Sequence, residues 1–148
     1  MITQNVDDLH ERAGSSHVLH LHGELMKVRS LRHPERVYTL PCDKLSDKGL
    51  ETSVDTVDDH GDHVRPHIVF FGEDVPNFGP ACELAQQADV MVVIGTSLVV
   101  YPAAGLVQYF RGDRIVLINK GSTSMDRTAD LLIQEPIGQV LGQIQVRR

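Results

Sequence analysis

The chain has 148 residues, of which 41% are hydrophobic and 23% are charged, and its formal net charge is −6. These values are typical of one globular domain, and the acidic balance argues against nonspecific binding to nucleic acid or anionic lipid, which needs a surplus of Lys and Arg. The longest apolar run, residues 90–94, is too short to cross a bilayer, and the first residues do not form a secretory signal. We therefore expect a cytoplasmic protein without nucleic-acid or membrane partners.

The first residues form a short apolar run that ends in a polar cluster. Gln4, Asn5 and Asp7 follow Met1 and Ile2 almost directly. Three polar side chains in four residues at the end of an apolar run suit a ligand better than a core. Because the strand that should carry them is barely present, we expect this chain to be the later portion of a longer protein.

Short strands alternate with amphipathic segments along the rest of the chain. Strands are predicted at 18–21, 68–71, 90–94, 114–118 and 131–133, and helices at 79–88, 102–110 and 136–146. The helix at 79–88 should bury one face, formed by Ala81, Leu84, Ala85 and Ala88. The strand at 90–94 is apolar at every position, as a strand covered on both faces must be. This order of elements predicts parallel pairing with right-handed crossovers, which is the α/β class.

The segment from 29 to 67 lacks sustained periodicity and contains Pro34, Pro41, Gly49, Gly61 and an acidic tract around 55–62. We predict that it is a small inserted lobe with a short strand at 37–40, and that residues 1–28 and 68–148 form the main domain. The two cysteines, Cys42 and Cys82, form no spaced framework, so we interpret them as reduced thiols. A disulfide between them is the alternative.

Ligands of open parallel sheets gather at the carboxyl ends of the strands, where this chain places three polar sets. The first is Gln4, Asn5 and Asp7, the second is Gly95, Thr96 and Ser97, and the third is Asn119. A Gly-Thr-Ser turn brings backbone N–H groups and hydroxyls to a phosphate or ribose, but it also forms ordinary turns. Asn119 can bind a ribose hydroxyl, or it can simply begin the turn that follows.

Two histidine-containing stretches have several interpretations. His20 and His22 are two residues apart, so on a strand they face the same way, as a metal pair, as a catalytic base with its neighbour, or as two packed histidines. From "HLHG" alone, packing is favoured. The stretch "DDHGDHVRPH" at 58–67 is dense in metal ligands but has no compact metal-binding spacing, which favours a solvated acidic loop over a metal site.

Five motifs together resemble the sirtuins, the NAD-dependent protein-lysine deacylases, and the bacterial branch in particular. They are TQNVDDLHERAG, LHGEL, RPHIVFFGE, IGTSLVVYPAAGL and the strand that ends at Asn119, in the family's order and spacing. The resemblance implies a deoxyhypusine synthase-like fold, which is a Rossmann-like parallel sheet with helices on both faces. It also implies NAD as the cofactor and acylated lysine in proteins or peptides as the substrate, with nicotinamide and O-acyl-ADP-ribose as products.

The resemblance also implies residue roles. His22 would be the general base on a ribose hydroxyl, a task that suits an imidazole near neutral pH. The cofactor would be bound by Gln4 and Asn5 (nicotinamide-side ribose), Asp7 (nicotinamide carboxamide), Gly95, Thr96 and Ser97 (phosphate and ribose) and Asn119 (adenosine ribose). The peptide would add as an extended strand along Val69, Phe70, Gly72, Glu73, Val99 and Tyr101, with Phe70 lining the acyl-lysine tunnel.

Two features depart from the family pattern. Ser30 stands where many members carry a zinc-binding cysteine, so we predict a lobe that has no structural zinc and is held by packing. The glycine-rich phosphate loop that precedes the QNxD motif is not in the sequence, so we expect weak NAD binding by this chain. The acyl-group preference stays open. The alternatives to a deacylase are a noncatalytic NAD- or ADP-ribose-binding module, and an NAD hydrolase or ADP-ribosyl transferase.

Overall fold

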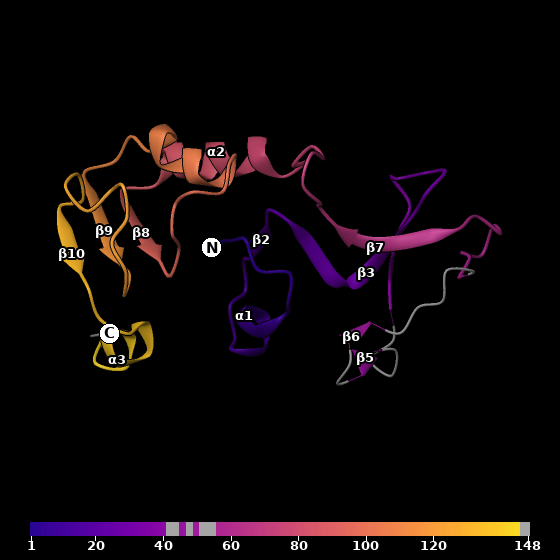
Figure 1. Cartoon of the computed structure of the whole chain (residues 1–148), viewed down its shortest axis with the longest axis horizontal. Helices are drawn as coiled ribbons and strands as arrows, with labels where there is room; N and C mark the ends of the chain where they lie inside the picture. Colours follow the sequence, from indigo (N-terminus) through magenta and orange to yellow (C-terminus); the bar gives the residue numbers. More distant parts are fainter. Residues whose placement is uncertain (41–44, 47–48, 51–55, 146–148) are drawn as a thin grey trace. The chain divides into compact units, whose positions relative to one another are not determined.

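A computed structural model describes residues 1–40, 45–46, 49–50 and 56–145 of the chain (Figure 1). Its internal contacts divide the chain into two compact units, Met1–Asn77 and Phe78–Arg148, and each unit is described by itself. The predicted lobe boundaries at 29 and 67 stay a prediction. Cys42, Pro41 and the start of the acidic tract lie outside the described residues.

In the first unit, the polar cluster directly follows the first of two paired parallel strands. β1 (Ile2–Thr3) pairs with β2 (Leu19–His20), and the short helix α1 (Leu9–Arg12) lies between them in the sequence. β2 confirms the strand predicted at 18–21. Leu21, the next residue, is 1% exposed and belongs to the core of this unit.

An antiparallel sheet of order β4-β3-β7 completes the first unit, together with the small hairpin β5 (Leu45–Ser46) and β6 (Gly49–Leu50). Its strands are β3 (Gly23–Ser30), β4 (Val37–Thr39) and β7 (Val64–Ile68). β4 confirms the strand predicted at 37–40. The strand predicted at 68–71 is wrong, because β7 ends at Ile68 and the two phenylalanines that follow are exposed. β7 is an edge strand, which is where a sheet tolerates a proline such as Pro66.

The second unit is built on three parallel strands in the order β10-β9-β8 (Figure 1). β8 (Val90–Ile94), β9 (Arg114–Ile118) and β10 (Leu131–Ile133) have the predicted bounds, and their parallel pairing confirms the α/β class. β9 is central and carries Leu117 and Ile118, which are 0% and 2% exposed. The prediction that β8 is covered on both faces is wrong for the described part of the chain. Val90 and Val92, on one face of this edge strand, are each about half exposed.

The helices of the second unit are α2 (Phe78–Gln87), the 3₁₀ helix η2 (Ala103–Tyr109) and α3 (Ile137–Leu141). α2 packs against η2, and the rings of Phe78 and Tyr109 meet edge to face at 5.8 Å. α2 buries Cys82 together with Ala81 and Ala85, whereas Leu84, which we predicted to be buried, is exposed. Both sets of residues have helical spacing, so periodicity alone did not distinguish them.

The C-terminal helix is shorter than predicted, since it ends at Leu141 rather than near residue 146, which lies outside the described residues. Searched over the described residues, the structure contains no helix that is both long and apolar enough to span a membrane.

Candidate functional site

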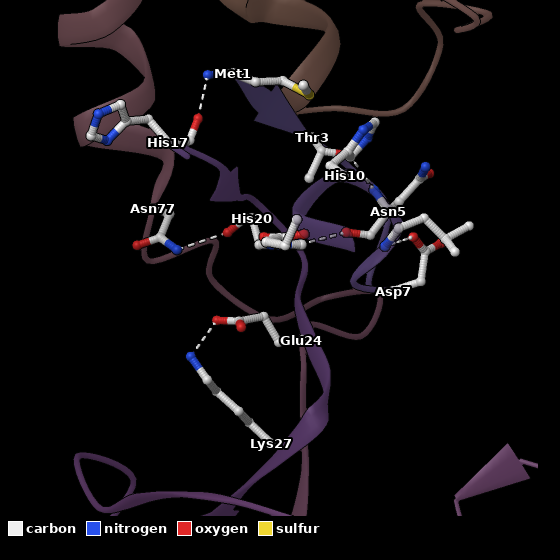
Figure 2. A network of polar contacts seen from close by, with 12 residues as sticks. Met1, Thr3, Asn5, Asp7, His10, His17, His20, Glu24, Lys27 and Asn77 are labelled. Atoms are coloured by element: carbon white, nitrogen blue, oxygen red, sulfur yellow. Dashed lines mark hydrogen bonds and ion pairs between the residues drawn. The ribbon is translucent and has the colours of Figure 1, made fainter. Parts of the chain in front are cut away.

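The backbone of the loop at residues 4–7 is bound by groups that come much later in the chain, as Figure 2 shows for Asn5 and His20. The Gln4 carbonyl accepts a hydrogen bond from Nδ1 of His22 at 3.2 Å, and the Asn5 carbonyl accepts one from Nδ1 of His20 at 3.0 Å. The Val6 carbonyl accepts the backbone N–H of a β3 residue at 2.7 Å. Three successive carbonyls are therefore held by the segment that runs from β2 into β3.

Side chains close to the loop in the sequence also hold it. The Asn5 N–H donates to Oγ1 of Thr3 at 3.1 Å, and that hydroxyl lies 3.3 Å from Nε2 of His10 on α1 (Figure 2). Oδ1 of Asp7 accepts the N–H of Leu9 at 3.1 Å, which begins α1 in the manner of an Asx turn. Asp7 thus has a structural task in the free protein, and its role toward nicotinamide stays a prediction.

The contact between His22 and Gln4 determines the tautomer of the imidazole. A carbonyl oxygen only accepts hydrogen bonds, so Nδ1 carries the hydrogen. In the neutral ring the lone pair is then on Nε2, the atom that a general base needs. The structure therefore makes His22 chemically suited to the predicted role, although the role itself stays a prediction.

The backbone geometry at position 23, directly after His22, requires a glycine. Its φ is +84°, and a Cβ built on it would lie 2.0 Å from the carbonyl oxygen of His67 on the paired strand β7. No other residue fits so close to a neighbouring backbone. The His22 carbonyl accepts the N–H of Val69 at 2.9 Å, so the candidate base is bonded directly to the start of the predicted substrate segment.

The predicted substrate segment is organised around Glu73. Its carboxylate accepts the Phe70 N–H at 2.9 Å and forms an ion pair with the guanidinium of Arg65. The bond from Arg65, followed by the bond from Phe70, lowers the pKa of Glu73. Arg65 also lies over the ring of Phe70, with Cζ 4.6 Å from the centroid. Phe70 is thereby fixed while remaining 53% exposed, and Gly72, at φ +87°, makes the turn back to Glu73.

Arg65, Thr3 and His20 are contact residues that the sequence alone did not assign. Arg65 stands in the RPHIVFFGE motif and His20 in HLHG, but nothing in either motif indicates which carboxylate or carbonyl each residue meets. Thr3 precedes the polar cluster and resembles an ordinary strand residue.

In the second unit, two of the predicted sets lie at the carboxyl ends of neighbouring strands, as expected. The N–H of Gly95, after β8, donates to the carbonyl of Ile118, the last residue of β9, at 3.0 Å. Oγ1 of Thr96 accepts the N–H of Leu98 at 3.2 Å, and Ser97 is exposed. The Gly-Thr-Ser segment thus forms a turn, and a Cβ on Gly95 would meet no atom of the protein within 4 Å.

Asn119 also takes part in a turn. Its Nδ2 donates to the carbonyl of Gly121 at 2.8 Å, and its backbone N–H donates to the carbonyl of Ile133 at 3.1 Å. The turn interpretation of Asn119 is therefore supported, and its ribose role stays a prediction. Val99 and Tyr101, the remaining predicted substrate residues, are 70% and 69% exposed.

The loop at 58–63 has a structural explanation. The Asp58 carboxylate accepts the N–H groups of His60 and Asp62 and the hydroxyl of Tyr38, so the loop is held by its own polar groups. Among the described residues, no group of three or more His, Cys, Asp or Glu side chains is arranged to hold a metal ion. Ser30 is 1% exposed, and its hydroxyl accepts the N–H of His33 at 3.1 Å in the turn after β3.

Parallel strands with polar residues at their carboxyl ends are typical of nucleotide-binding α/β proteins. The sequence model described as "Sir2 family" matches residues 1–102, and the chain belongs to the Sir2 family. It is 59% identical over 107 residues to a protein named "NAD-dependent protein deacylase" from Aggregatibacter actinomycetemcomitans, a match that covers 72% of this chain and 48% of that protein.

Solved structures agree with this assignment. A Sir2 homologue in complex with NAD is similar with a TM-score of 0.81 and 38% identity, over 95% of this chain and 54% of that one. A Sir2 protein bound to acetylated peptide is similar with a TM-score of 0.79 and 37% identity, over 94% and 59% respectively. The chain spans about half the length of the curated relatives it matches.

Proposed function

We propose that this chain is part of an NAD-dependent deacylase that removes acyl groups from lysine side chains of proteins. The observation that carries the proposal is the hydrogen bond from His22 Nδ1 to the Gln4 carbonyl, which leaves Nε2 as the basic nitrogen beside the loop at residues 4–7. Family membership and the names of the relatives, which include deacylases and deacetylases, support the reaction class.

We propose NAD as the cofactor, with the residues that the family resemblance assigns to cofactor binding as its contacts. When bound, NAD would supply the ribose carbon that loses nicotinamide and accepts the acyl oxygen. The residues fit such a group: Gly95 leaves open space where a Cβ would stand, and Gln4, Asn5 and Asp7 offer amide and carboxylate groups on a fixed backbone. A Sir2 homologue solved with NAD supports this assignment.

The protein's own contribution to the chemistry is proton transfer at His22. Nε2 would accept the proton of a ribose hydroxyl, while Nδ1 keeps its hydrogen bond to the Gln4 carbonyl. General-base catalysis of this kind contributes about 10²- to 10⁴-fold in rate.

The acylated peptide would contact residues 69–73, where Phe70 presents an exposed ring that Arg65 and Glu73 hold in place. Val99 and Tyr101 would contribute through their exposed side chains. The Sir2 structure with bound acetylated peptide supports a peptide substrate. A cytoplasmic location and the lack of nucleic-acid and membrane partners also stay predictions.

The test uses a fusion protein, called the joined protein below, in which this chain replaces the matching part of the Aggregatibacter relative. It is supplied with NAD and with acetylated and succinylated lysine peptides. We expect nicotinamide, free lysine peptide and O-acyl-ADP-ribose, identified by mass spectrometry. His22→Ala should lower turnover by about 100-fold or more, whereas His17→Ala, an exposed histidine of the same unit, should not change it.

Other products would replace the proposal. Free ADP-ribose as the main product would indicate an NAD hydrolase, and ADP-ribose attached to protein would indicate a transferase. Binding of ADP-ribose without turnover would indicate a noncatalytic module. Full activity of His22→Ala would remove His22 from the role of base.

A further inference from the structure

His20 is buried between two hydrogen-bond acceptors. It is 6% exposed, its Nδ1 lies 3.0 Å from the Asn5 carbonyl oxygen, and its Nε2 lies 2.8 Å from Oε1 of Glu11 on α1. Neutral imidazole has only one N–H, and neither a carbonyl nor a carboxylate oxygen donates. Both contacts are therefore hydrogen bonds only when the ring carries two protons, as an imidazolium.

The surroundings of His20 favour this charged form. Burial alone would lower the pKa of His20, but the bonds to Glu11 and Asn5 and the negative charges of Glu11 and Glu24 outweigh it and raise the pKa above its ordinary value. In return, the bond from His20 lowers the pKa of Glu11.

The charged and polar groups near the His20 ring come from α1, from β3 and from the segment before α2. α1 contributes Glu11 and His10, and β3 contributes Glu24, whose carboxylate is paired with Lys27 at 2.7 Å. The segment before α2 contributes Asn77, a neutral amide that donates to the backbone carbonyl of His20 at 2.7 Å (Figure 2).

We propose that His20 is a positioning residue for NAD binding: as an imidazolium it ties the Asn5 carbonyl to Glu11 and thereby helps to hold the loop at residues 4–7, and it loses one of these two hydrogen bonds when it loses a proton. This inference rests on the proposed function, in which Gln4, Asn5 and Asp7 of that loop bind the nicotinamide end of NAD.

The sign of the pH dependence follows from the raised pKa of His20. The bridge is complete below the ordinary imidazole pKa and is lost as the pH rises through the higher pKa of the folded protein. KM for NAD should therefore rise on the alkaline side.

The kinetic test uses the joined protein and three variants. Gln is uncharged and has its donors on a single nitrogen, whereas His20 meets its two acceptors through two separate ring nitrogens. For His20→Gln, KM for NAD should therefore rise about tenfold at every pH, with kcat at saturating NAD within about twofold. Glu11→Gln keeps an acceptor but removes the charge, so the alkaline rise in KM should move to lower pH. The control is Glu35→Gln, which alters an exposed pair of the same kind, His33–Glu35 at 3.3 Å, and should match wild type.

An independent test measures the ring itself in the 148-residue chain. NMR of ¹⁵N-labelled histidine should show His20 losing its second proton at a higher pH than an ordinary imidazole, and Glu11→Gln should shift this titration downward. A titration at or below the pH of an ordinary imidazole would overturn the proposal, as would unchanged KM and pH profiles in both His20→Gln and Glu11→Gln.

The two tests separate the failures. If His20→Gln does not fold, Glu11→Gln, which keeps the imidazole, decides the kinetic question. If the wild-type joined protein binds no NAD, the proposed function fails and so does this role in NAD binding, while the NMR titration still reports whether the charged bridge exists.

Discussion

The loop at residues 4–7 and the turn at residues 95–98 both follow a parallel strand, yet they are held in different ways. The loop is bound by His22 and His20, which are 18 and 15 residues away from the carbonyls they contact. The turn is held by Thr96 and its near neighbour Leu98, and by positive φ angles at Gly95 and Leu98 of +60° and +55°. A backbone bond from Gly95 to Ile118 also ties it to the next strand.

This difference indicates where each region is vulnerable. The shape of the turn depends mainly on the residues within it. The shape of the loop depends on side chains elsewhere in the fold, including the imidazoles of His20 and His22. A substitution or a pH change that touches no ligand-binding residue can therefore disturb the loop, whereas the turn should be indifferent to both.

The largest effect is expected from Gly23→Ala, which acts at the start of β3, directly after His22. The new Cβ would lie 2.0 Å from a backbone oxygen in a left-handed conformation, so we expect a loss of about 3 kcal/mol or more in the free energy of unfolding. Urea denaturation measures it. Gly61→Ala is the control: its φ is +79° but its Cβ would meet nothing within 4 Å, so it should lose only about 1 kcal/mol.

An intermediate effect is expected from removing one hydroxyl in each region. Thr3→Val leaves the N–H of Asn5 without its acceptor at a site that is 7% exposed, which should cost about 1–2 kcal/mol of folding free energy. Thr96→Val removes the corresponding acceptor in the more open turn, where about 0.5 kcal/mol is expected because water can replace it. Equal losses in parallel urea titrations would show that the two regions are held alike.

The smallest effect on stability is expected from Asn119→Ala, which removes the bond to the Gly121 carbonyl in an accessible turn. About 0.5 kcal/mol should be lost, as for the control Thr128→Ala, which removes a similar turn bond in the same unit. The Kd for NAD of the joined protein, measured by calorimetry, should rise about tenfold for Asn119→Ala alone. An unchanged Kd would assign Asn119 to the turn only.

The strands of the second unit were predictable because they depend on a local pattern of apolar residues. The bounds of β8, β9 and β10 match the predicted strands, since apolar runs bounded by polar and turn residues mark strands directly. The strand after Pro66 was misplaced because an apolar run also occurs where aromatic side chains are exposed, as Phe71 is at 99%. The buried face of α2 was misassigned at Leu84 because two overlapping helical stripes fit the same sequence.

The sequence by itself determined the family, the α/β class, and the positions of Gln4, Asn5, Asp7 and His22 in motifs of fixed order. Only the tertiary structure decided that His22 donates through Nδ1, that Gly23 passes close to the His67 backbone, and that His20 bridges Asn5 and Glu11. The physical reason is that a motif is a local pattern, whereas each of these contacts joins residues that meet only when strands pair and a helix packs beside them. Two histidines in one short motif therefore acquire different hydrogen-bond partners elsewhere in the chain.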